Sequence, residues 1–278
     1  MTVTPTVPTS AEATRRLLVL ASALFAVVIG QAQIFMGWGQ SPAEFAADSD
    51  ATLRVTGYAF AIWGIIYGWL LVYAVRQAMP ATPATPLLKA LGWPSVGALL
   101  AIGVWIVAAA FDWETSTIVL IFGALLVLLI PLWANAGAIR ALPRRDGDRW
   151  MTVWPLALLA GWLTVAAPVN LLTVVTGNGD LPSVLPPTDW AILAVVTVGV
   201  VALTVTARLR MLAYALPVSW GLMGVYTAEQ SRNPPLALTA MVVAIAVLAG
   251  AILLVLRHRP AGSVADGDVK ADTSAASR

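Results

Sequence analysis

Residues 117–150 read TIVLIFGALLVLLIPLWANAGAIRALPRRDGDRW, an apolar run up to Ala136 that is followed by four arginines. A helix needs about 20 mostly apolar residues to cross the roughly 30 Å hydrocarbon core of a bilayer, and residues 117–136 meet this requirement. Arginine and lysine gather in the cytoplasmic loops of membrane proteins, close to the ends of the spans. This stretch therefore predicts a transmembrane helix whose carboxyl end faces the cytoplasm.

Further stretches of the chain have the same apolar character, although some only approach the full length. Together the predicted spans are residues 17–35, 57–73, 91–111, 117–136, 154–175, 190–207, 211–227 and 235–256. Hydrophobic residues make up 59% of the chain and charged residues 11%, which is too apolar for a soluble domain of 278 residues. We therefore predict an all-α integral membrane protein, a polytopic bundle of about eight transmembrane helices.

The basic residues predict how these spans are oriented. Apart from Arg54 and Arg232, every Lys and Arg lies before the first predicted span, after an even-numbered span, or in the C-terminal tail. By the positive-inside rule, both termini are then cytoplasmic. A single long helix over residues 190–227 would instead leave Arg208 and Arg210 near mid-membrane, at a cost of roughly 2.5 to 3.5 kcal/mol each. We expect two separate helices there.

Both ends of the chain are expected to be disordered cytoplasmic tails. Residues 1–14 are rich in Thr, Pro and Ala, and residues 260–278 are rich in Ala, Ser, Asp and Gly. Such compositions bury too little apolar surface to offset the entropy of folding. Arg15 and Arg16 before an apolar run also resemble the start of a signal peptide, but no small-x-small cleavage pattern follows. We expect this run to be retained as the first span.

The side chains available for chemistry exclude several classes of function. The chain has no cysteine, and its single histidine, His258, follows the last predicted span, so ligand sets for zinc, iron–sulfur clusters or bis-histidine haem are lacking. No Asp, Glu, Lys, Arg or His falls inside a predicted span, which argues against a proton pump. Every carboxylate is expected in a loop or tail, outside any catalytic constellation. We expect no enzymatic activity, no metal site and no required cofactor.

Tryptophan is unusually frequent, with 12 residues in 278. Most of them lie near the ends of the predicted spans, as is typical of the aromatic belts at membrane interfaces. Trp63, Trp105, Trp162 and Trp220 fall several residues inside their spans, where an indole N–H prefers a hydrogen-bond partner. Each of these four is expected either to pack in the core or to face a ligand.

Two spacings place selected side chains on single helix faces. Trp63 and Tyr67 are four residues apart and Phe60 precedes Trp63 by three, so the three share one stripe. The second row, in the fifth predicted span, consists of Trp162, Ala166 and Asn170. The small residue at the centre of this row would let another helix or a flat ligand approach closely.

In these features the chain resembles the TspO/MBR family, the tryptophan-rich sensory proteins related to the mitochondrial translocator protein. Its second span is similar to the family's Phe…Trp-x-x-x-Tyr motif, and its fifth span to the family's Trp-x3-Ala-x3-Asn row. Trp105, followed by the aromatic Phe111, is similar to the tryptophan midway through the family's third helix. The resemblance covers residues 15–177, a five-helix unit, and leaves residues 188–257 as an additional three-helix unit.

The resemblance implies a pocket for a flat hydrophobic ligand, open toward the outer side. The family binds porphyrins and sterols, so a tetrapyrrole is the first candidate. In this family the first external loop caps the cavity. Residues 37–56 are therefore expected to form a lid that carries Trp38 and Phe45. Asn170 is expected to be a polar handle for the ligand. The predicted lining residues are Phe60, Trp63, Tyr67, Trp105, Trp162, Ala166 and Asn170.

The leading hypothesis is a membrane receptor or carrier with a sensory or regulatory role. A facilitative transporter of a small neutral or amphipathic solute is the first alternative, and light-dependent porphyrin degradation, suggested for some members of the resembled family, is the second. The expected partners are the lipid bilayer and a hydrophobic small molecule, with no nucleic acid, and the sequence also allows a homodimer. The Ala-, Val- and Arg-rich composition favours a bacterial plasma membrane.

Overall fold

Apolar segments become helices in a bilayer because each backbone polar group must find its partner within the segment. The computed structural model describes residues 10–47 and 52–257, and over these ranges the chain is helical, without β-strands. Residues 1–9 of the predicted N-terminal tail, the whole predicted C-terminal tail and His258 lie outside the described residues. A 3₁₀-helix, η1 (Gly57–Ala61), and a π-helix, η2 (Arg149–Val153), accompany the α-helices. The α-helices are α1 (Ser10–Met36), α2 (Pro42–Ala47), α3 (Ile62–Ala78), α4 (Pro86–Ala110), α5 (Glu114–Ala134), α6 (Ala136–Ala141), α7 (Trp154–Gly177), α8 (Pro187–Leu209), α9 (Leu212–Glu229) and α10 (Pro234–Leu256).

Within the described part of the chain, seven helical segments are long and apolar enough to cross a membrane. They are α1, α3 with η1, α4, α5, α7 with η2, α8 and α10. The prediction of an all-helical polytopic membrane protein is confirmed at this level. Helix α9, which covers most of the seventh predicted span, is outside this set. It packs against α7, α8 and α10 and buries most of its side chains. A helix enclosed by other helices does not need a wholly apolar surface.

The predicted break between α8 and α9 is confirmed. Helix α8 ends at Leu209, and Arg210 adopts the left-handed conformation with φ 55° and ψ 43°. A left-handed residue stops a helix because it turns the chain away from the helix axis. Met211 is then extended, and α9 begins at Leu212. The Arg210 guanidinium donates to the carbonyl of Leu254 in α10 at 3.0 Å, so the turn is held against the neighbouring helix.

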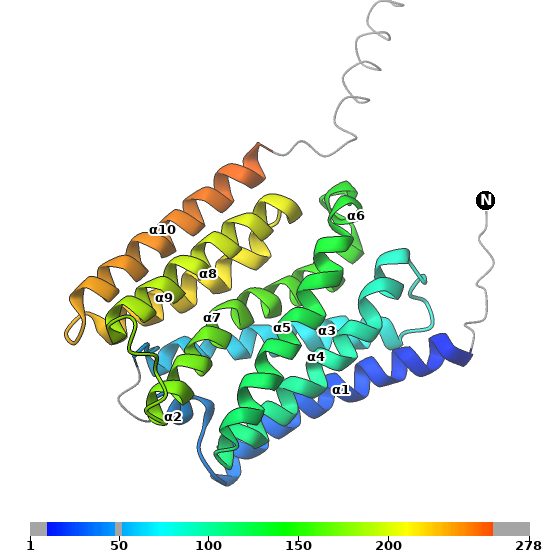
Figure 1. Cartoon of the computed structure of the whole chain (residues 1–278). Coiled ribbons are helices and arrows are strands. Elements are labelled where there is room, and N and C mark those ends of the chain that lie inside the picture. The colour runs from blue at the N-terminus through cyan, green and yellow to red at the C-terminus, as the bar shows by residue number, and fades with distance from the viewer. Residues whose placement is uncertain (1–9, 48–51, 258–278) are drawn as a thin grey trace, which may run out of the picture.

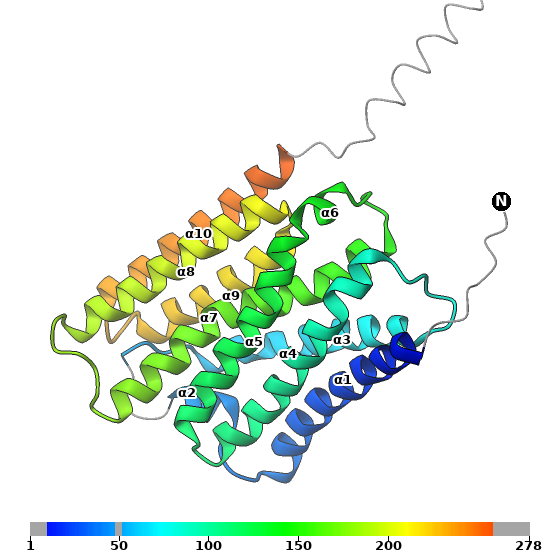
Figure 2. The ribbon, with the colours of Figure 1, turned by 45° about the vertical axis from the view of Figure 1, so that its right-hand side comes forward.

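The helices lie side by side in an order that both ribbon views show. Figures 1 and 2 place α8 and α10 at one edge of the bundle and α1 at the opposite edge, with α5 and α7 between them. Helix α7, together with η2, is the most enclosed of the seven candidate spans, since 78% of an apolar stretch of 18 residues within it is buried. It meets α9 closely at Gly161, where an added Cβ would overlap the carbonyl oxygen of Tyr214. Glycine therefore sets how near α7 and α9 approach.

Helix α1 begins earlier than predicted, because residues 10–14, which we expected in the tail, are helical. The first turns are anchored by side chains that reach α4. Arg15 is only 4% exposed and donates to the carbonyl of Leu88 at 2.6 Å. Glu12 forms an ion pair with Lys89 at 3.2 Å. Composition alone did not reveal these long-range contacts, which order the segment.

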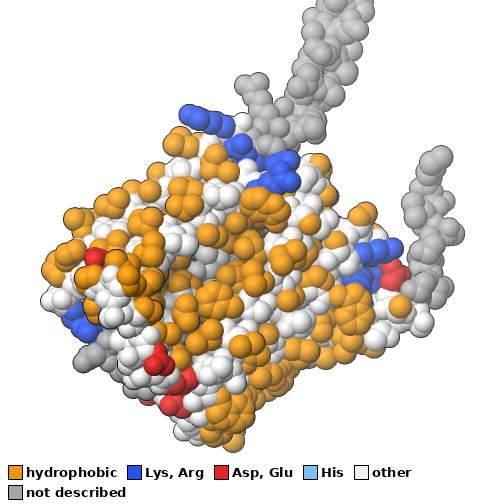
Figure 3. Space-filling model, in the orientation of Figure 1, with side chains coloured by type: hydrophobic (Ala, Val, Ile, Leu, Met, Phe, Trp, Pro, Cys, Tyr) orange, Lys and Arg blue, Asp and Glu red, His pale blue; other side chains and the backbone are white. Residues whose placement is uncertain are grey.

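Charged residues gather at opposite ends of the bundle. Figure 3 shows most of the visible Lys and Arg side chains near the start of α1 and the ends of α8 and α10, and most of the visible Asp and Glu at the far end. We call these the basic end and the acidic end. An ion pair between Arg76 Nη1 and Asp148 Oδ1, at 2.7 Å, also lies at the basic end. The alternation of basic and acidic loops along the chain therefore gives the bundle one basic end and one acidic end.

Candidate ligand-binding site

The predicted aromatic stripe forms a cluster between α3 and α7. Phe60 belongs to η1 and not to a regular α-helix, but in a 3₁₀-helix residues three apart eclipse one another, which keeps it in line with Trp63. Trp63 lies 4.9 Å from Tyr67 between ring centroids. The rings of Phe60 and Trp63 both meet Trp162 of α7 edge-on, at 6.0 and 6.2 Å. Such edge-to-face pairs are the favoured geometry of aromatic rings.

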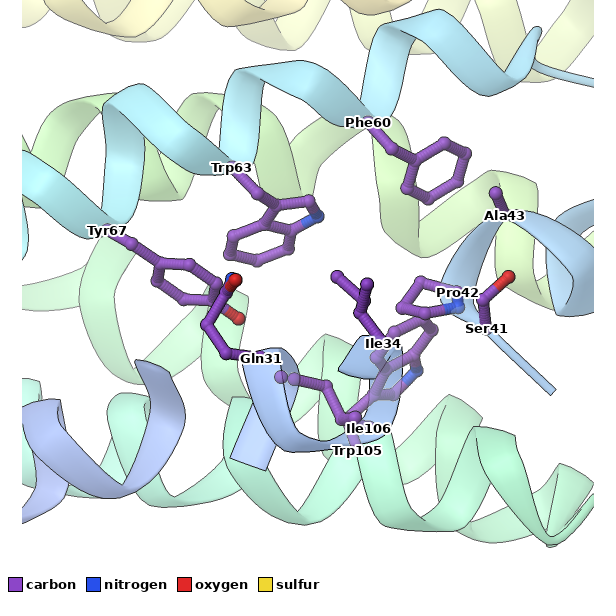
Figure 4. Close-up of a pocket in the computed structure, with 11 residues that line it drawn as sticks. Gln31, Ile34, Ser41, Pro42, Ala43, Phe60, Trp63, Tyr67, Trp105 and Ile106 are labelled. Carbon is purple, nitrogen blue, oxygen red and sulfur yellow. The ribbon is translucent and has the colours of Figure 1, made fainter. Parts of the chain in front are cut away.

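A first pocket, of about 140 Å³, opens beside this cluster. Figure 4 shows Phe60, Trp63 and Tyr67 on one side of it, with Trp105 and Ile106 of α4 opposite. Helix α1 and the start of α2 complete the wall. The full lining is Gly30, Gln31, Ile34, Ser41, Pro42, Ala43, Phe60, Trp63, Tyr67, Trp105 and Ile106. The wall is therefore mainly apolar and aromatic, with few polar groups.

A second pocket, of about 30 Å³, adjoins the first and shares Pro42, Phe60 and Trp105 with it. Its remaining lining residues are Phe45, Ala46, Val55, Trp162, Val165, Ala166, Val169 and Asn170. The two pockets together include all seven residues predicted to line a ligand site. Segments as distant as Phe60 and Asn170 are thus brought to one place, although their role in binding stays a prediction.

Asn170 links three helices from a buried position, with 4% of its surface exposed. Its side-chain oxygen accepts a hydrogen bond from the indole Nε1–H of Trp105 at 3.0 Å. Its Nδ2 donates to the hydroxyl of Thr117 at 2.9 Å, and that hydroxyl donates to the Glu114 carbonyl at 2.6 Å. Asn170 therefore orients Trp105 between the two pockets. These two hydrogen bonds within the protein use part of the hydrogen-bonding capacity that Asn170 could offer to a ligand.

The predicted lid contains α2, whose start is held by a reciprocal capping box. The backbone N–H of Ser41 donates to Glu44 Oε2 at 2.7 Å, and the N–H of Glu44 donates to Ser41 Oγ at 3.2 Å. The Ser41 N–H favours the charged carboxylate and so lowers the pKa of Glu44 below its ordinary value. Phe45 is 3% exposed and meets Trp105 edge-on at 6.1 Å. It covers the second pocket.

Trp38, the other predicted lid residue, lies apart from both pockets. Its ring stacks on Phe111 with centroids 5.8 Å apart, and its carbonyl accepts a hydrogen bond from Gln33. It therefore packs the entry of the lid loop against the end of α4. Residues 48–51 of the predicted lid lie outside the described residues.

The contribution of α1 to the first pocket was missed by sequence reasoning. Gly30, Gln31 and Ile34 line this pocket, and α1 lies close to its neighbours at Gly30, where an added Cβ would be 3.1 Å from Ile106 Cδ1 and 3.4 Å from the Tyr67 hydroxyl. Gly30 and Ile34 are four residues apart, which is a helical spacing. This spacing was available as a signal, but nothing in it indicated which helix α1 would face.

The expectation that every carboxylate lies in a loop or tail is wrong, because five of them lie in helices: Glu12, Glu44, Glu114, Asp189 and Glu229. The most buried of the five is Glu229. It belongs to the last turn of α9 and is 2% exposed. Its Oε1 accepts a hydrogen bond from the backbone N–H of Arg54 at 3.1 Å and lies 3.5 Å from Arg232 Nη1. Glu229 lines neither pocket. The carboxylate thus ties the segment that leads into η1 to α9.

The comparison with protein families covers almost the whole bundle. A family model described as TSPO-like protein matches residues 15–254, a range that includes α8, α9 and nearly all of α10. No curated protein and no solved structure matches the chain. The family match therefore extends beyond residues 15–177, the five-helix unit that the sequence motifs indicated. The chain belongs to the TSPO-like protein family.

Proposed function

We propose that the protein is a non-enzymatic membrane receptor or carrier that binds a flat hydrophobic ligand, with a tetrapyrrole as the first candidate. One observation carries the proposal. Residues chosen for their spacing in separate segments line two adjoining pockets, and Phe60 and Trp105 belong to both. Pockets with aromatic walls and few polar groups are typical of sites for hydrophobic small molecules.

The wall chemistry suits a flat ring system. Trp63, Tyr67 and Trp162 offer ring faces and edges, and each aromatic pair contributes about 0.5 to 1.5 kcal/mol beyond the burial of area. Ala166 is the small residue at the centre of the α7 row and lines the second pocket, so a planar ligand could approach the helix there. The amide of Gln31 lines the first pocket and supplies a polar group on the α1 side.

The pockets, at about 140 and 30 Å³, are smaller than the roughly 300 to 1,000 Å³ of sites for drug-sized ligands. Binding of a tetrapyrrole therefore requires a part of the wall to move. Helix α2 is the part that we assign this role. It is only six residues long and rests on the pockets through Phe45, so its displacement would join the two cavities.

We further propose that the chain crosses the membrane eight times, with α9 as the seventh span, and that both termini are cytoplasmic. The basic end would then face the cytoplasm of a bacterium, and the pockets, which lie under α2, would face the outer side of the plasma membrane. The positive-inside rule supports this orientation, because Arg15, Arg76, Arg140, Arg208 and Arg257 all lie near the ends of helices at the basic end.

The test is titration of the purified protein with protoporphyrin IX, followed by both tryptophan quenching and porphyrin absorbance. We expect saturable binding. Substitution of Trp63→Phe together with Trp162→Phe should weaken it about threefold or more, because ring contacts are lost. Phe45→Ala should also weaken it. Trp93→Phe is the matched control, since Trp93 lines neither pocket.

Equal affinity of the wild type and the Trp63→Phe, Trp162→Phe double variant would contradict the assigned site. Absence of saturable binding would remove the tetrapyrrole and favour the facilitative transporter, which predicts solute flux in protein-containing vesicles. Loss of porphyrin absorbance under light, dependent on the same tryptophans, would instead favour porphyrin degradation.

A further inference from the structure

A separate groove runs between α5 and α8 and shares no lining residue with the aromatic pockets. It has a volume of about 470 Å³ and is almost entirely apolar. Its lining residues are Leu129, Ile130, Trp133, Ala134, Val200, Val201, Thr204 and Val205. Ile130 and Val200 are 64% and 59% exposed, although both helices are candidate membrane spans. Side chains exposed on a transmembrane helix face lipid, so this groove is a lipid-facing depression.

The groove ends at cationic side chains. The Arg208 guanidinium lies over the ring of Trp133, with 5.6 Å between its central carbon and the ring centroid. Arg140 of α6 reaches the same place, because its Nη1 donates to the backbone carbonyl of Arg208 at 2.9 Å. Arg208 is exposed, and no ion pair among the described residues involves it. Figure 3 shows basic side chains of this end above a hydrophobic surface.

We propose that this groove binds an anionic phospholipid of the leaflet at the basic end. An acyl chain fills the apolar depression between α5 and α8, and the headgroup phosphate meets Arg208, whose backbone carbonyl is held by Arg140. Guanidinium groups match phosphate geometry through paired N–H donors. Basic pockets between transmembrane helices on the cytoplasmic side commonly hold anionic headgroups. A free phosphate ion would leave the apolar groove empty, whereas a phospholipid would fill both the groove and the basic site. The shape of the site therefore favours a lipid.

The position of this site gives the lipid a structural role. Helix α5 belongs to the five-helix unit of residues 15–177, and α8 is the first of the following three helices. The two helices pack lightly against each other, since α8 packs mainly on α9 and α10. A lipid bound in the groove would bridge the two sets of helices at the basic end. This inference does not depend on the proposed ligand of the aromatic pockets.

The test uses the full chain in phosphatidylcholine vesicles that contain either brominated phosphatidylglycerol or brominated phosphatidylcholine at the same fraction. Bromine on the acyl chain quenches tryptophan on contact. Subtracting the fluorescence of the Trp133→Phe version of each protein from that of the same protein with Trp133 isolates the signal of Trp133. We expect quenching of Trp133 to correspond to an occupancy about fivefold higher for the brominated anionic lipid, because one arginine at the membrane surface supplies roughly this preference.

Arg208→Gln should bring the ratio of occupancy by the anionic lipid to occupancy by phosphatidylcholine close to one. Arg257→Gln removes the same charge at the same end but outside the groove, and it should leave this ratio unchanged. Thr204→Phe should lower the quenching by the anionic lipid, because the new ring fills the groove while Arg208 stays. Inorganic phosphate at millimolar concentration should not compete.

Four outcomes would overturn the inference. They are equal quenching by both lipids in the unmodified chain, a preference that survives Arg208→Gln, a preference that Arg257→Gln removes equally, and competition by inorganic phosphate. The last outcome would identify a site for a free anion in place of a lipid. Quenching that Thr204→Phe leaves intact would likewise move the acyl chain out of the groove.

Discussion

Replacement of Asn170 by alanine would remove the acceptor of a buried indole. The Trp105 Nε1–H would lose its partner at 3.0 Å in a site where Trp105 is 8% exposed. A buried donor left without an acceptor costs about 1 to 3 kcal/mol. The bond from Asn170 to Thr117 would also be lost, at about 0.6 kcal/mol on average for such bonds in membrane proteins. We expect Asn170→Ala to lower the free energy of unfolding by about 1.5 to 3.5 kcal/mol.

A double-mutant cycle separates the contribution of the hydrogen bond between Trp105 and Asn170 from the other effects of Asn170→Ala. Trp105→Phe removes the N–H but keeps an aromatic ring, so no orphaned donor remains when Asn170→Ala is added. The cost of Asn170→Ala should therefore fall to about 1 kcal/mol or less in the Trp105→Phe background. The measurement is denaturant unfolding of the detergent-solubilised protein, followed by circular dichroism. If Asn170→Ala cost the same in both backgrounds, within about 0.5 kcal/mol, the hydrogen bond would not be the reason for its effect.

Two further predictions concern the lid and the topology. Because the pKa of Glu44 is lowered in the folded chain, its capping bond stabilises α2 at neutral pH and is lost as the pH falls below the ordinary glutamate value near 4.5. Hydrogen exchange of α2 should thus be faster in Glu44→Ala than in the wild type at pH 7, and the difference should shrink as the pH falls below the ordinary glutamate value; a difference that does not shrink in acid would rule out the carboxylate as its source. The chain has no cysteine, so Ser183→Cys and Ala141→Cys can be labelled individually in intact cells. An impermeant maleimide should label only the variant at Ser183, and the reverse result would invert the proposed orientation.

The sequence predicted the helices well because the requirement behind them is local. A span must be apolar over about 20 residues, whatever its neighbours are. The break at Arg210 was also predictable, because two arginines at mid-membrane are costly. The start of α1 was not, because the segment that contains Glu12 is ordered by contacts with α4, more than 70 residues away along the chain.

The sequence likewise predicted some features of the candidate site and missed others. Helical spacing put Trp162 and Asn170 on one face before any neighbour was known, and both line the second pocket. The share of α1 was missed, and Trp38 was placed over a pocket that it does not reach. In a membrane protein the faces toward lipid and toward other helices are both apolar, so periodicity does not identify the buried face.

By itself, the sequence determined that this is a polytopic helical membrane protein, where its long helices lie along the chain, and which end of the bundle is basic, because hydrophobic length and loop charge act on each segment separately. Only the tertiary structure decided which helices meet. It enclosed α9 between α7 and α10, brought Gly30 of α1 to Tyr67, and engaged Asn170 with Trp105. These outcomes depend on packing and hydrogen bonds between residues that are distant along the chain, and no local pattern contains them.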